Sequence, residues 1–112
     1  MATIASGSDV LTLVNVFTVK PEDQQQLVQL LIDPTEQTMK HLPGFVSASI
    51  HKSHDGKKVI NYAQWRSQQD FEAMTRNPET KPHMEAAAAL ATFEPVLCEV
   101  VDSIGVEELM PR

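Results

Sequence analysis

The chain has 112 residues, 42% of them hydrophobic, and a formal net charge of −6 at pH 7. This length and apolar content are typical of a single domain, which buries roughly two-thirds of the surface that its unfolded chain exposes. The acidic balance argues against a nucleic-acid partner, because no basic cluster exceeds Lys57-Lys58.

The beginning of the chain has none of the features of a targeting signal. Residues 1–9 contain neither a positive n-region nor an apolar h-region, and no segment has the length needed to span a bilayer. We therefore expect a cytoplasmic protein without a membrane partner. Its expected parts are a flexible N-terminus over residues 1–9, a folded domain over residues 10–104 and a polar tail over residues 105–112.

The first predicted elements are a strand and a helix. Residues 11–19 are rich in β-branched and apolar side chains, which favour a strand. Pro21 followed by two acidic residues is typical of a helix start, and Pro34 predicts a kink further along. Leu42-Pro43-Gly44 ends the helical region. The apolar stripe of the helix consists of Leu27, Leu30 and Leu31, and Met39 and Leu42 extend it.

A hairpin follows. Residues 45–51 and 58–65 are predicted strands, and the segment 53–56, Ser-His-Asp-Gly, is a turn signal between them. His51 and His54 have the spacing of two metal ligands, but no third ligand is near in the sequence. We interpret them as solvated side chains and expect no metal site.

The second half predicts two helical pieces and a last strand. The segment 67–70, Ser-Gln-Gln-Asp, is a capping box that begins a helix, and Asn77-Pro78 interrupts it. A second piece is expected from about residue 79 to 91, where a run of alanines favours helix. The last strand is expected over residues 93–104. It contains Pro95, which is tolerated only at a sheet edge or a strand start.

The predicted order of elements is β-α-β-β-α-β. This is the order of the ferredoxin-like α+β fold, in which two helices cover one face of a four-stranded antiparallel sheet. The usual strand order of that fold, 4-1-3-2, places the last strand at an edge, as Pro95 requires. The first and third strands then become central neighbours.

Two asparagines lie within these central strands. Burying the amide of Asn15 or Asn61 without a partner costs roughly 1–3 kcal/mol. Because side chains alternate along a strand, Asn61 shares a face with Ala63 and Trp65, a combination that predicts the lining of a cavity. A structural hydrogen bond from each asparagine to a loop or helix end is the alternative. Whether the two asparagines share a face depends on the strand register.

Apolar residues also lie on the face that two helices leave open. Val14 and Val16 project there from the first strand, and Ile60 and Tyr62 project there from the third. An exposed apolar face of this extent is typical of an interface. We therefore predict a homodimer in which sheet packs against sheet.

Four short motifs in this order resemble the antibiotic biosynthesis monooxygenase family. They are Leu13-Val14-Asn15-Val16-Phe17-Thr18-Val19, Leu42-Pro43-Gly44-Phe45, Val59-Ile60-Asn61-Tyr62-Ala63-Gln64-Trp65 and Lys81-Pro82-His83-Met84. The match covers roughly residues 10–104. It is closest to the cofactor-independent anthrone oxygenases of aromatic polyketide pathways, and next to the small quinol monooxygenases. The resemblance implies a dimeric α+β barrel.

The resemblance also implies an activity. Such enzymes oxidise an electron-rich phenol, anthrone or hydroquinone with O2 and use neither metal nor flavin. Ground-state oxygen reacts slowly with closed-shell molecules, so the deprotonated substrate supplies an electron, and a dry pocket holds the oxygenated intermediate. Asn15, Asn61, Trp65 and His83 match the family's site residues. The amides and the indole would stabilise an anionic oxygen, and the imidazole would accept a proton near neutral pH.

Five further side chains are expected to complete a pocket for a planar aromatic substrate. They are Phe17, Phe45, Phe71, Met74 and Leu90, and each of them also suits an ordinary core. Some anthrone oxygenases have a tyrosine six residues after the tryptophan, where this chain has Phe71. A phenol donor is therefore absent at that position.

Two other functions remain open at this point. Haem-degrading relatives use an asparagine, a tryptophan and a histidine, which map to Asn15, Trp65 and His83, although Asn61 has no part in that scheme. The other is a non-catalytic dimeric module that binds a metabolite or serves in stress. Without the resemblance, Trp65 suits an ordinary core and His83 an ordinary surface position.

Overall fold

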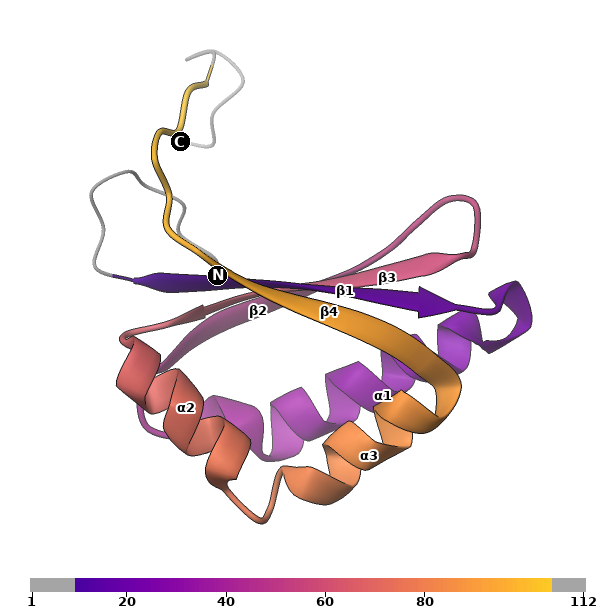
Figure 1. Ribbon diagram of the computed structural model, residues 1–112, viewed down its shortest axis with the longest axis horizontal. Helices are drawn as coiled ribbons and strands as arrows, with labels where there is room; N and C mark the ends of the chain where they lie inside the picture. Colours follow the sequence, from indigo (N-terminus) through magenta and orange to yellow (C-terminus); the bar gives the residue numbers. More distant parts are fainter. Residues whose placement is uncertain (1–9, 106–112) are drawn as a thin grey trace.

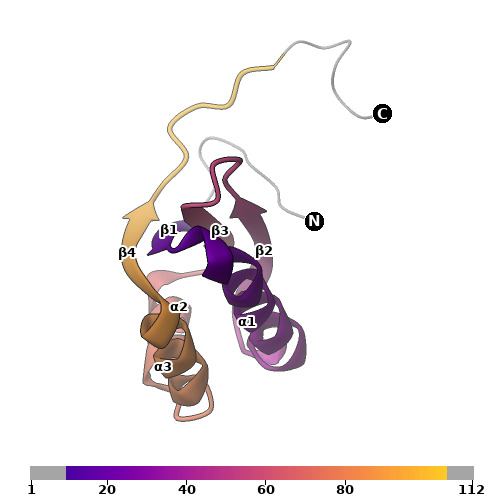
Figure 2. The ribbon, with the colours of Figure 1, turned by 90° about the vertical axis from the view of Figure 1, so that its right-hand side faces the viewer.

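A computed structural model describes residues 10–105 of the chain. Four antiparallel strands form one sheet in the order β2-β3-β1-β4, and the helices lie together on one face of it (Figure 1, Figure 2). The strands are β1 (Leu11–Val19), β2 (Phe45–Lys52), β3 (Lys58–Trp65) and β4 (Ala91–Cys98). The helices are η1 (Pro21–Asp23), α1 (Gln24–Gln37), η2 (Met39–His41), α2 (Gln68–Arg76) and α3 (Lys81–Leu90), where η marks a short 3-10 helix.

The predicted ferredoxin-like α+β fold and its 4-1-3-2 strand order are confirmed. The flexible N-terminus expected over residues 1–9 lies outside the described residues, as do residues 106–112 of the expected polar tail. The division into parts therefore stays a prediction. Within residues 10–105, no helix combines the length and apolar character that a membrane crossing requires.

Pro34 lies inside α1 and does not end the helix. The helix continues to Gln37, and the N–H of Thr38 donates to the carbonyl of Pro34 at 2.9 Å. Leu27 of the predicted stripe is fully buried. Met39, predicted to extend the stripe past Pro34, lies on the separate η2 rather than on α1, and Leu42 lies beyond η2. Packing of the apolar face against the sheet holds α1 together across the proline.

The capping box predicted at the start of α2 is confirmed. The N–H of Asp70 donates to Ser67 Oγ at 3.1 Å, which satisfies one of the free N–H groups of the first turn. Gly44 packs against the same helix end, with φ +84° and so little space that an added Cβ would collide with the Asp70 side chain. A glycine is therefore required where the chain enters β2.

The last strand differs from its predicted limits. It begins at Ala91, directly after α3, and ends at Cys98, whereas residues 93–104 were expected. Cys98 pairs with Thr12, next to the first residue of β1, so the neighbouring strand offers no partner for a longer β4. Val101 and Ile104 are accordingly exposed. The edge position predicted for Pro95 is confirmed.

The core lies between the sheet and two of the helices. Its buried residues are Phe17, Val19, Leu27, Val59, Ala87 and Ala91. The other face of the sheet carries no helix (Figure 2). There, Val14, Val16, Ile60 and Tyr62 are only half-buried. The open apolar face on which the homodimer prediction rests is therefore present in the fold.

Candidate active site

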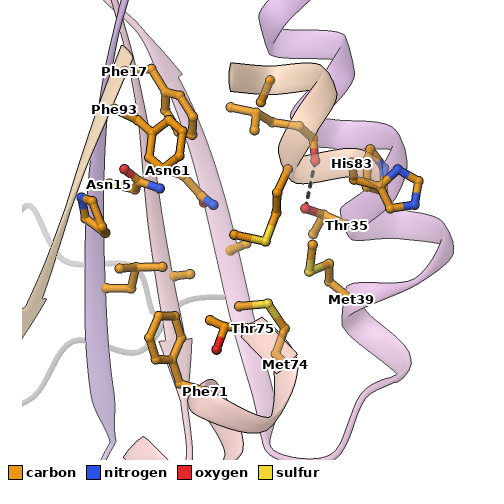
Figure 3. Close-up of a pocket in the computed structure, with 18 of the residues that line it drawn as sticks. Asn15, Phe17, Thr35, Met39, Asn61, Phe71, Met74, Thr75, His83 and Phe93 are labelled. Atoms are coloured by element: carbon orange, nitrogen blue, oxygen red, sulfur yellow. Dashed lines mark hydrogen bonds between the residues drawn. The ribbon is translucent and has the colours of Figure 1, made fainter. Parts of the chain in front are cut away.

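The strand register places the two asparagines directly opposite each other. Asn15 of β1 pairs with Asn61 of β3, so both side chains project from the same face, toward the helices. Figure 3 shows them side by side. Each Oδ1 is buried and accepts no hydrogen bond. Neither oxygen therefore serves a loop or a helix end, which leaves two adjacent acceptors free for a ligand.

Aromatic rings lie on both sides of this amide pair. The ring centroids of Phe17 and Phe93 lie 5.4 Å apart on one side of the pair, and Phe71 lies on the other side (Figure 3). Trp65 is only 2% exposed. Its ring makes edge-to-face contacts with the rings of Phe45 and Phe71, at centroid distances of 5.4 Å and 6.4 Å. Edge-to-face contacts fix ring orientation, so the indole has little freedom to move.

A cavity of about 180 Å³ separates the asparagines from the helices. Eight of the nine residues selected from the sequence line it, namely Asn15, Phe17, Phe45, Asn61, Trp65, Phe71, Met74 and His83. Leu90 does not line it and packs against the hydrophobic core instead. On α3, His83, Met84 and Ala87 line the cavity, whereas Leu90 is the last residue of the helix and lies against the core.

His83 is the only ionisable side chain among the described residues that line the cavity. It is half-buried on α3, on the helix side and across the cavity from the two asparagines (Figure 3). Two carboxyl groups with a lowered pKa lie elsewhere: Glu36, which accepts a hydrogen bond from Lys40, and Asp55, which accepts one from Ser53. Among the described lining residues, His83 is therefore the side chain that could exchange a proton with a ligand in this cavity.

Several lining residues were not expected from the sequence. Thr35, Met39, Thr75 and Met84 face the cavity from the helix side, and Phe93 and Pro95 face it from β4. Phe93 and Pro95 pair with Phe17 and Asn15 in the register, so a known register would have indicated them. No group of three His, Cys, Asp or Glu side chains suited to a metal occurs within residues 10–105.

Comparison with known proteins shows which family the chain belongs to. The profile of the family described as antibiotic biosynthesis monooxygenase matches residues 10–90. The tetracenomycin-F1 monooxygenase of Streptomyces glaucescens is 49% identical over 105 residues, which is 94% of each chain. The cofactor-independent oxygenase SnoaB from Streptomyces nogalater superposes with a TM-score of 0.74 at 27% identity, over 87% of this chain and 98% of its own.

A further solved structure is the monooxygenase ActVA-Orf6 of Streptomyces coelicolor in complex with nanaomycin D. It has a TM-score of 0.74 at 30% identity, over 91% of this chain and 92% of its own. The chain belongs to the antibiotic biosynthesis monooxygenase family. It is a monooxygenase of the kind found in antibiotic biosynthesis, as the sequence predicted, and the non-catalytic alternative is set aside.

Proposed function

We propose that the enzyme oxidises a polycyclic phenol or anthrone, of the class named by its tetracenomycin relative, with O2 and without a cofactor. The observation that carries this proposal is the pair of buried, unpartnered oxygens on Asn15 and Asn61. A buried acceptor without a partner is unfavourable in the free protein, and a phenolic O–H is a donor that removes the penalty.

The first step of the proposed reaction is loss of a proton from the substrate. An O–H of the substrate donates to an asparagine oxygen, and a separate acidic proton on the side of the substrate that faces the helices passes to His83, which leaves the substrate as an anion. The amide of each asparagine also carries an N–H2 group, a neutral donor that would stabilise the new anion. Neutral donors stabilise the anion without burying a counter-charge.

Oxygen then reacts with the anion inside the cavity. The anion gives one electron to O2, the two radicals combine, and the peroxide that forms breaks down so that one oxygen atom enters the product and the other leaves as water. The rings of Phe17, Phe93 and Phe71 would hold the substrate flat against the sheet. Trp65, fixed between two phenylalanines, would shape the end of the slot beside the reacting carbon.

A homodimer is part of this proposal. Val14, Val16, Ile60 and Tyr62 are half-buried on the helix-free face of the sheet, and Val96 beside them is 41% exposed. Pairing two such faces would remove apolar surface from water. Light scattering after size-exclusion chromatography should give twice the chain mass of 12.4 kDa at micromolar concentration, and a monomer mass would exclude the dimer. The cytoplasmic location also stays a prediction.

The test of the activity is oxygen uptake by chelator-treated, flavin-free protein with a panel of anthrones, naphthols and hydroquinones. We expect uptake with the polycyclic phenols and a large loss in Asn61→Ala. Uptake only after a metal or flavin is added would overturn the cofactor-free reaction. A stoichiometric Soret shift with haem, abolished in His83→Ala, would favour haem degradation instead, although that reaction leaves the orphaned oxygen of Asn61 without a role.

A further inference from the structure

All methionines of residues 10–105 line the one cavity described above. The chain has five methionines, of which Met1 and Met110 lie outside the described residues. The other three, Met39, Met74 and Met84, are all cavity-lining. They come from three different elements, η2, α2 and α3, so their meeting is a product of the tertiary fold.

The three thioethers lie on the helix side, facing the amides. Figure 3 shows the sulfur atoms of Met39 and Met74 directed into the cavity, with Asn15 and Asn61 on the opposite strands. Their exposure differs: Met74 is 9% exposed and Met84 is 38% exposed. A thioether is the side chain most readily oxidised by peroxide after a thiolate, and the cavity contains no cysteine among its lining residues.

We propose that these methionines form an oxidisable lining that intercepts peroxide released inside the cavity. The inference rests on the proposed function. In an unproductive turnover a polycyclic phenol of the hydroquinone type loses two electrons and two protons to O2, which yields the quinone and hydrogen peroxide. The O–O bond of the peroxide then breaks, one oxygen bonds to a methionine sulfur, which loses two electrons, and the other leaves as water.

Oxidation at these positions has a functional consequence. A sulfoxide replaces a soft apolar atom with a polar S=O group, which suits an apolar cavity poorly and reduces binding of a planar apolar ligand. The change is reversible by methionine sulfoxide reductases. The number of turnovers before the enzyme loses activity therefore depends on Met39, Met74 and Met84, and reduction restores that activity.

The experiment compares two sources of peroxide by peptide mass spectrometry. Hydrogen peroxide added from solution should oxidise Met84 before Met74, because Met84 is more exposed. Turnover with substrate, O2 and catalase should raise the ratio of sulfoxide at Met74 to sulfoxide at Met84 several-fold, since catalase removes only the peroxide that has left the cavity. An unchanged ratio, or complete protection by catalase, would overturn the inference.

A variant pair tests the consequence. Met74→Leu should complete several-fold more turnovers before half of its own initial rate is lost, and Met110→Leu should behave as the unmodified enzyme does. Met39→Leu provides a second variant if Met74→Leu folds poorly. Oxygen uptake without cavity sulfoxide would overturn this inference alone, whereas absence of oxygen uptake would overturn the proposed function.

Discussion

The cavity has two walls of different construction. On the sheet wall, Phe17, Ala63 and Trp65 are at most 4% exposed and belong to β1 and β3, which pair in continuous register. On the helix wall, Thr35 and Met39 are half-buried and Met84 is 38% exposed. Backbone hydrogen bonds fix positions across the sheet, whereas the helices that form the other wall are held against one another mainly by side-chain packing.

The division suits a reaction on a flat substrate. The unpartnered oxygens of Asn15 and Asn61 lie on the sheet wall, where the backbone holds each of them in place. Groups that act on reacting atoms need this precision. The methionines and threonines lie on the helix wall, where they can adapt to the rest of the ligand. In the proposed reaction, the sheet wall would therefore carry the chemistry and the helix wall would accommodate the substrate.

The largest effect is expected from truncating the sheet wall. Trp65→Ala should reduce the free energy of unfolding by about 3–5 kcal/mol, because it removes a fully buried ring and leaves a void between two phenylalanines. Met84→Ala on the helix wall is the matched control and should cost much less, since Met84 is partly exposed. Urea denaturation measures both. Equal losses would show that the walls do not differ in rigidity.

The next effect concerns activity rather than stability. Asn61→Ala should lower kcat/KM by about 10²–10³, the typical loss on removing one group that stabilises a developing anion. Its free energy of unfolding should stay the same or rise, because a buried oxygen without a hydrogen-bond partner is removed. Thr75→Ala is the control on the helix wall, since its hydroxyl already donates to the carbonyl of Glu72 at 2.7 Å. If both variants lose activity equally, the loss in Asn61→Ala does not come from stabilisation of the anion by this asparagine.

A smaller effect is expected where the helix wall is anchored. Ser67→Ala removes the N-cap of α2, the helix that carries Phe71 and Met74, and should cost about 1 kcal/mol of unfolding free energy. KM should rise more than kcat falls, because in the proposed reaction α2 supplies residues that bind the substrate, whereas the two asparagines lie on the sheet. Steady-state kinetics separates the two parameters. A fall in kcat with unchanged KM would assign α2 a role in the chemistry.

The smallest effect lies outside both walls. The pKa of Asp55 is lowered from its ordinary 3.8 by hydrogen bonds from Ser53 Oγ and the N–H of Lys57. The ionised form is therefore favoured in the folded state, so the stabilisation is complete above pH 3.8 and is lost as the pH falls below it. Asp55→Asn should flatten this part of the stability curve without affecting activity. Thermal melts from pH 3 to pH 6 would measure the change.

Much of the site could be predicted because its residues belong to strong local patterns. Asn15, Asn61 and Trp65 stand out in strands where side chains alternate, so their face relative to their own neighbours follows from the sequence. Leu90 was misplaced because an alanine-rich helix has a weak apolar stripe and gives little indication of which side faces inward. Met39 and Met84 carry no chemical signal at all until the helices are brought together.

The sequence by itself determined the order of the elements, the edge position of Pro95, the start of α2 at Ser67 and the membership of the family. The order and the helix start follow from apolar periods and capping between residues close in the chain. The place of Pro95 follows from its missing N–H donor, and the family from four short motifs in a fixed order. Only the tertiary structure decided that Asn15 faces Asn61, that β4 ends at Cys98 and that three methionines share one cavity. Strand register and helix contacts join segments distant in the sequence, and a shift of one residue would turn every side chain to the other face.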